Sequence, residues 1–236
     1  VTSQIAMTSG RYEIQAFLFR ANANNDILED LSEWVDNGAV TLDTERDVSW
    51  TLECEMRPEG YRKLRPFVDW LAPYLRVTLP DGSVRYGQLG HFVVLPSARE
   101  VGETSETVTI DARSPETLLQ MQGTKGYMYI KENTQLDNAM RVILRECHLG
   151  EDPNGKPRFN IPPWTNRRAG RDMTWEKRED ALQILNDVAK KAHAPPLFAS
   201  KTGVISAVDR RDRRLKRLNP VRVFAANVPD GLVDPW

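Results

Sequence analysis

The segment from Val48 to Met56 (VSWTLECEM) alternates strictly between apolar and polar side chains. Its apolar residues are Val48, Trp50, Leu52, Cys54 and Met56, and its polar residues are Ser49, Thr51, Glu53 and Glu55. Successive side chains of a strand point to opposite faces, so this segment predicts a strand with one buried face and one solvated face. A two-stranded hairpin cannot cover such an apolar row. We therefore expect this strand to lie inside a β-barrel or sandwich.

Other strand-like segments surround it, rich in branched and aromatic residues and separated by short turns. They are residues 12–19, 75–79, 84–89, 91–95 and 107–112. Residues 27–35 instead carry apolar side chains at a spacing that predicts one or two helical turns. Because no long helical pattern interrupts residues 11–112, we expect an antiparallel β-barrel domain over residues 1–112.

The pattern becomes helical after residue 112. Ser114, Pro115 and Glu116 suit a helix start, and Thr134 and Thr174 are expected to cap two longer helices. The apolar stripes of those helices are Leu136, Ala139, Met140, Ile143, Leu144 and Cys147, then Ala181, Leu182, Leu185, Val188, Ala189 and Ala192. We expect a small α+β domain over residues 113–208. A basic return segment, residues 209–236, could complete a second barrel, and the fold class is α+β.

Charge excludes some functions. The chain has 32 Lys and Arg against 33 Asp and Glu, a net charge of −1, so bulk electrostatics favours neither nucleic acid nor an anionic membrane. No apolar run approaches the length of about 20 residues that a membrane-spanning helix needs. We expect no membrane-spanning segment.

The sequence also shows no motif that is typical of a metal or cofactor site. His91, His148 and His193 stand alone, without Cys or His neighbours at ligand spacing, and His91 is expected to be a core or surface histidine. Cys54 and Cys147 are expected to be small core residues. The sequence has no Walker loop and no nucleophile elbow. We expect no metal, no cofactor and no catalytic residue.

Glu53 and Glu55 share the polar face of the central strand, where two carboxylates could come within range for glycoside hydrolysis. No aromatic sugar platform accompanies them. Solvated acids, or acids that pair with basic residues across an interface, are the favoured interpretation.

Two further features suggest an interface. The segment 209–217 is densely basic, through Arg210, Arg211, Arg213, Arg214, Lys216 and Arg217. It is interpreted as a solvated turn, as a contact for an acidic neighbouring subunit or, least favoured because no aromatic residues interleave, as a nucleic-acid contact. Trp164 follows Pro162 and Pro163, and either anchors an interface or folds back on its own domain.

The order of these segments resembles the tail-hub or baseplate proteins of tailed bacteriophages, especially minor tail proteins of long-tailed phages that infect actinobacteria. The resemblance covers about residues 12–208. Its motifs are GAVTLDTER followed by DVSWTLEC, the hairpin PYLRVTLPDGSVRYGQLGHFVV, the segment TVTIDARSPETLL, Thr174-Trp175-Glu176 before a helix, and a hairpin around Lys201-Thr202-Gly203.

The resemblance implies a structural virion protein rather than an enzyme. Such hubs form a trimeric ring with two similar barrels per subunit, which joins the hexameric tail tube to the tip or fibre assembly. The implied partners are a second and third copy, the tail tube, the distal tail protein and the tip or fibre proteins. DNA would pass transiently through the lumen, where Glu53 and Glu55 would suit the wall. The location would be the virion tail tip, after assembly in the host cytoplasm. A tail-associated cell-wall hydrolase and a hexameric distal tail adaptor are the alternatives.

Overall fold

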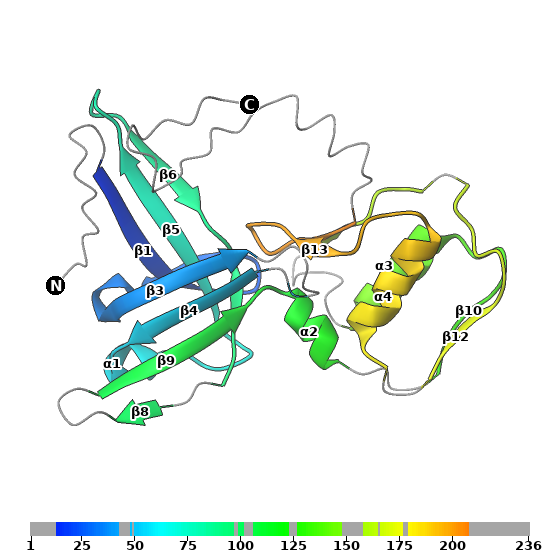
Figure 1. Ribbon diagram of the computed structural model, residues 1–236, viewed down its shortest axis with the longest axis horizontal. Helices are drawn as coiled ribbons and strands as arrows, with labels where there is room; N and C mark the ends of the chain where they lie inside the picture. The colour runs from blue at the N-terminus through cyan, green and yellow to red at the C-terminus, as the bar shows by residue number, and fades with distance from the viewer. Residues whose placement is uncertain are drawn as a thin grey trace.

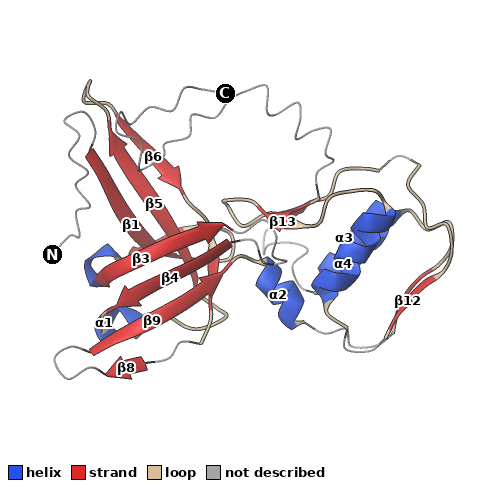
Figure 2. Cartoon of the chain, in the orientation of Figure 1, coloured by secondary structure: helices blue, strands red, loops and turns tan. Residues whose placement is uncertain are grey.

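The computed structural model describes residues 13–42, 48, 50–96, 99–101, 106–122, 127–147, 158–164, 166–176 and 179–207. A large sheet occupies one part of the molecule, and the longer helices lie in the other part (Figures 1 and 2). The sheet is antiparallel, and the second part combines short strands with helices. The predicted α+β class is therefore confirmed.

The sheet has nine strands in the order β2-β1-β5-β7-β9-β4-β3, with β6 beside β5 and β8 beside β9. The strands are β1 (Glu13–Ala21), β2 (Ile27–Asp30), β3 (Val35–Leu42), β4 (Trp50–Met56), β5 (Trp70–Thr78), β6 (Val84–Gln88), β7 (Phe92–Val94), β8 (Arg99–Val101) and β9 (Glu106–Arg113). Strand β4 is the alternating segment of the sequence, and it pairs with β3 on one side and β9 on the other.

The interior of the sheet agrees with the alternation in β4. Leu52, Cys54 and Met56 are buried and join a cluster to which other strands contribute Leu18, Phe92 and Ile110. Trp50, at the start of the strand, is partly buried and packs against that cluster. The even-numbered face of β4 is thus the core face, as predicted.

A closed barrel is not confirmed. Within the described residues no pairing joins the two edge strands, β2 and β3. The chain links these edges at one end only, through the short 3₁₀ helix η1 (Ser32–Trp34). Asp30 accepts hydrogen bonds from the backbone N–H and the hydroxyl of Ser32, which turns the chain out of β2 after four residues. The strand is consequently short. The prediction of helical turns over residues 27–35 is therefore wrong for residues 27–30, which form β2, and is confirmed only for the short helix η1.

The α+β unit contains α2 (Glu116–Met121), β10 (Met128–Ile130), α3 (Leu136–Glu146), β11 (Phe159–Asn160), β12 (Met173–Trp175), α4 (Ala181–Lys191), β13 (Phe198–Ala199) and β14 (Ile205–Ser206). A further short helix, α1 (Pro58–Tyr61), follows β4. The apolar stripes of α3 and α4 face each other in one buried cluster. The amphipathic patterns predicted for these two helices are therefore confirmed.

Both predicted caps are wrong. Helix α3 follows Gln135, and no side chain caps it. Thr174 lies in β12 opposite Tyr129 of β10. Its backbone is part of this strand pairing, so Thr174 does not begin a helix. The N-cap of α4 is Asp180, whose carboxylate accepts hydrogen bonds from the N–H groups of Leu182 and Gln183.

Candidate interaction surfaces

Glu53 and Glu55 lie on the exposed face of β4. Across the ladder, Glu53 is opposite Asp111 of β9 and Glu55 is opposite Thr109. Arg113 donates to Asp111 at 2.8 Å. This hydrogen bonding and the nearby charge of Glu53 raise the pKa of the Arg113 guanidinium. The face is acidic and open to solvent, an arrangement that suits an electrostatic surface better than an enclosed acid–base pair.

The outer strand β6 forms a second surface (Figure 1). It pairs with β5 from Val84 to Gln88, and the described part of the chain provides no second neighbour for it. Tyr86 is 68% exposed and Val84 39% exposed. A free strand edge presents unpaired backbone groups that another strand can join. This edge is a candidate contact for a further protein chain.

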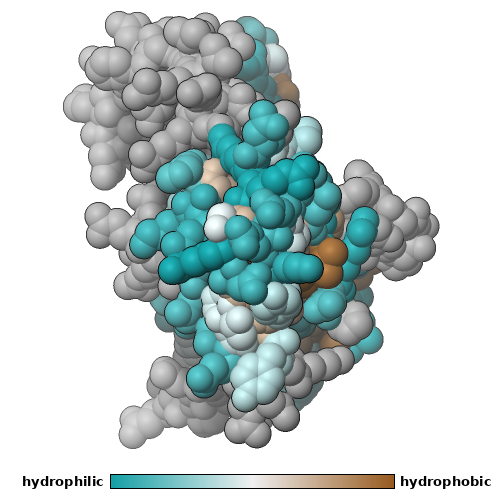
Figure 3. Space-filling model, turned by 90° about the vertical axis from the view of Figure 1, so that its right-hand side faces the viewer, coloured by the Kyte–Doolittle hydropathy of each residue, from teal (hydrophilic) through white to brown (hydrophobic). Residues whose placement is uncertain are grey.

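The α+β unit presents a different face. Viewed from its end, most of the described surface is hydrophilic (Figure 3). Its exposed large side chains with apolar character include Tyr127, Tyr129 and Val142, which are spread over the unit. Scattered residues of this kind are normal on a soluble surface.

A buried joint connects the sheet to the hairpin β13–β14. The ring of His91 stacks on Trp70 with centroids 4.5 Å apart, and its Nε2 lies 3.0 Å from the carbonyl oxygen of Asn22. Gly203, in the turn of the hairpin, packs directly against this ring. Burial lowers the pKa of His91 to about 4, against the effect of the Asn22 carbonyl and with a smaller contribution from the charge of Arg158. Of the two expected settings, core or surface, His91 has the buried one.

Two more contacts hold the same joint. The backbone N–H of Ala199 in β13 donates to Oε1 of Glu116 at 2.5 Å. Burial raises the pKa of Glu116 despite its hydrogen bonds. Arg158 donates from Nη2 to Oδ1 of Asn24 at 2.9 Å, which ties the segment before β11 to the turn after β1. Sequence reasoning did not find these contacts, because they join residues far apart in the chain.

Trp164 is 3% exposed and belongs to the core cluster of the α+β unit. Of the two alternatives, this burial favours the one in which Trp164 folds back on its own domain, and its assignment as an interface residue stays a prediction. The six predicted basic interface residues of segment 209–217 lie outside the described residues: Arg210, Arg211, Arg213, Arg214, Lys216 and Arg217.

Within the described ranges, no group of three or more His, Cys, Asp or Glu side chains could hold a metal ion. Among the same residues, no helix is long and apolar enough to cross a bilayer.

Comparison with known proteins shows which solved structures share this fold. No protein-family model matches the chain, and no curated protein matches it. Solved structures with a similar fold include a tail protein and a prophage tail protein. The resemblance predicted from the sequence is therefore confirmed at the level of the fold.

The tail protein from Neisseria meningitidis MC58 has a TM-score of 0.53 and 9% identity, over 81% of this chain and 50% of that chain. The 43 kDa tail protein of prophage MuSo2 from Shewanella oneidensis has a TM-score of 0.50 and 15% identity, over 82% of this chain and 52% of that chain. This chain thus spans about half the length of either tail protein.

Proposed function

We propose that this chain is a structural component of a phage tail, a hub or baseplate subunit that joins the tail tube to the tip or fibre assembly. The observation that carries this proposal is the fold shared with two tail proteins, one of them from a prophage, over four-fifths of the chain. The exposed setting of Glu53 and Glu55 supports a structural role over an enzymatic one.

The subunits would form a closed ring, with a trimer favoured. Rings close through heterologous contacts, in which one surface of a subunit meets a different surface of the next. The free edge of β6, with exposed Val84 and Tyr86, supports such a contact. The further partners would be the tail tube, the distal tail protein and the tip or fibre proteins. The protein would act at the tail tip of the virion after assembly in the host cytoplasm.

In this proposal, residues 1–112 are the hub domain and residues 113–208 a second domain. Residues 209–236 are a return segment whose arginines meet an acidic neighbour. The exposed face of β3, β4 and β9 would line the channel. This face carries three acidic side chains, Glu53, Glu55 and Asp111, and the basic side chain of Arg113. Its net negative charge would repel the phosphates of passing DNA and prevent them from binding to the channel wall.

Native mass measurement of the purified protein, combined with an image of the intact particle, tests this proposal. A trimeric ring at the tail tip is the expected result. A hexameric ring beside the tube would favour a distal tail adaptor. Absence of the chain from purified particles would overturn the structural role. So would clearing of host cell wall in a zymogram, if Glu53→Gln abolishes the clearing.

A further inference from the structure

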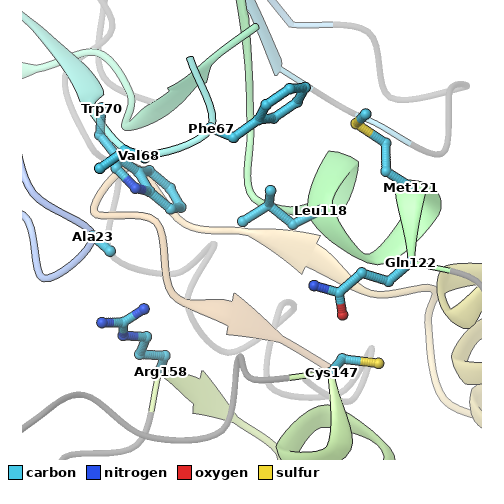
Figure 4. A pocket seen from close by; sticks show the side chains of 9 residues that line it. All are labelled: Ala23, Phe67, Val68, Trp70, Leu118, Met121, Gln122, Cys147 and Arg158. Carbon is cyan, nitrogen blue, oxygen red and sulfur yellow. The ribbon is translucent and has the colours of Figure 1, made fainter. Parts of the chain in front are cut away.

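A groove of about 480 Å³ lies at the junction of the sheet and the α+β unit (Figure 4). One wall consists of Phe67 and Val68, which precede β5, and of Trp70, the first residue of β5. Helix α2 supplies Leu118 and Met121 on the other side. The lining is mainly apolar. The indole of Trp70 is buried, whereas the side chains of Phe67, Val68 and Met121 are exposed to solvent.

The apolar side chains at the mouth of the groove are unusually exposed. Phe67 is 42% exposed, Val68 55% and Met121 57%. Large apolar side chains gathered around a concavity mark binding sites, whereas single ones scattered over a surface do not. This cluster therefore differs from isolated exposed residues such as Val142 on α3.

The backbone at Phe67 is strained. Its φ is 63°, in the left-handed region that bulky residues rarely adopt, at a cost of about 1–3 kcal/mol. A hydrogen bond of 2.8 Å from its N–H to the carbonyl of Val94 holds this conformation. Strain of this kind is concentrated at binding sites, where the surrounding structure maintains it. Here it maintains a phenyl ring at the mouth of the groove.

Arg158 adds a positive charge to the lining. Its Nη2 donates to the neutral amide of Asn24, and its Nε is buried without a hydrogen-bond partner in the described part of the chain. No carboxylate among the described residues forms an ion pair with it. A partly buried guanidinium in this situation favours an anionic ligand group, since a charge-assisted hydrogen bond would satisfy it.

We propose that this groove binds a segment of a neighbouring tail protein, which inserts a bulky apolar side chain between Val68 and Met121 and pairs an adjacent carboxylate with Arg158. The identity of the neighbour as a tail protein rests on the proposed function. The ligand chemistry, an apolar body next to an anion, rests on the groove alone. The two can therefore be tested separately.

The chemistry is tested on the isolated protein with two fluorescent dyes of similar shape. Anilinonaphthalene sulfonate carries an anion, and N-phenylnaphthylamine is its uncharged analogue. We expect Arg158→Gln to weaken binding of the sulfonate about tenfold, the loss of one charge-assisted contact, and to leave the neutral dye unchanged. Arg158→Lys should restore most of the sulfonate binding. Equal losses for both dyes would overturn the assignment of Arg158.

A matched pair of variants tests the location. Val68 and Val142 have similar exposure, 55% and 50%, so glutamate at either position should fold. Val68→Glu should weaken sulfonate binding at least tenfold through charge repulsion at the groove, and Val142→Glu should not change it. The groove is not the binding site if the two variants behave alike.

Cys147 provides the test in the particle, because it lines the groove and is partly buried, while the other cysteine, Cys54, is fully buried. We expect N-ethylmaleimide to modify Cys147 in the free protein several times faster than in purified tails, with Cys54 unmodified in both. Equal rates in free protein and tails that contain the chain would overturn the proposed partner. If tails lack the chain altogether, the structural role fails while the dye results still decide the groove's chemistry.

Discussion

A Cβ atom added to Gly203 would lie 2.4 Å from Nδ1 of His91. The hairpin β13–β14 therefore rests on the imidazole with no room for a side chain, and this contact connects the α+β unit to the sheet.

This contact predicts an unequal cost of two identical substitutions. Gly203 and Gly82 both have φ of 79°, but nothing lies within 4 Å of a Cβ at Gly82. Gly82→Ala should lose about 1 kcal/mol of unfolding free energy through backbone strain alone. Gly203→Ala should lose about 2 kcal/mol more, because His91 has to move. Urea unfolding of both variants measures the difference, and equal losses would show that His91 yields freely.

His91 also predicts a dependence of stability on pH. Its pKa in the folded protein is about 4, below the unfolded value of 6.5, so the unfolded chain binds the proton more readily. Stability is then full above pH 6.5 and falls as the pH drops towards about 4, by about 3 kcal/mol for this group. The groups that face the ring are the Asn22 carbonyl and the charge of Arg158. His91→Phe, which keeps the stacking on Trp70, should flatten the unfolding free energy across this range; an unchanged slope would contradict the assignment.

Glu116 predicts the opposite sign. Burial raises its pKa above the ordinary value of 4.5, so the folded protein binds this proton more readily than the unfolded chain does. The contribution of Glu116 is full below pH 4.5 and is lost as the pH rises through the folded-state pKa. Glu116→Gln retains an oxygen for the N–H of Ala199 and carries no charge. The variant should gain stability relative to the natural chain as the pH rises from 4 to 8, and a constant difference would rule this out.

The burial of Trp164 predicts a graded loss. Trp164→Ala should lower the unfolding free energy by about 3–5 kcal/mol, because it leaves a cavity in the core of the α+β unit. Trp164→Phe should cost less than half of that, since the indole N–H it removes has no hydrogen-bond partner in the described part of the chain. Thermal or urea unfolding measures both. Unchanged stability of Trp164→Ala with lost particle assembly would instead place Trp164 at an interface.

The acidic face of β4 predicts a change in assembly without a change in folding. Glu53→Lys with Glu55→Lys should alter the unfolding free energy by less than about 0.5 kcal/mol, because both side chains are exposed. Infectivity should fall if this face lines a channel for DNA, since lysines would bind the phosphates.

Glu132 and Glu146 are exposed on the α+β unit and provide the control. Their replacement by lysine should leave infectivity intact. Equal infectivity of the two double variants, measured by plaque counts, would remove β4 from the channel wall.

Helix N-termini illustrate where local reasoning failed. Thr174 lies before the charged residues 176–180 and an apolar stripe, which is typical of an N-cap, yet it pairs with Tyr129 in a strand. A weak capping preference of about 1 kcal/mol is overridden when strand pairing satisfies the same backbone groups. Asp180 then takes the cap six residues later.

The sequence by itself determined the core face of β4 and the facing stripes of α3 and α4, because the direction of a side chain along a strand or helix repeats with a local period. The tertiary structure alone decided that β5 pairs with both β1 and β7, that Trp164 turns inward, and that His91 meets Gly203. Each of these depends on contacts between residues distant in the chain, and their free energies come from burial and from backbone partners that no local pattern specifies.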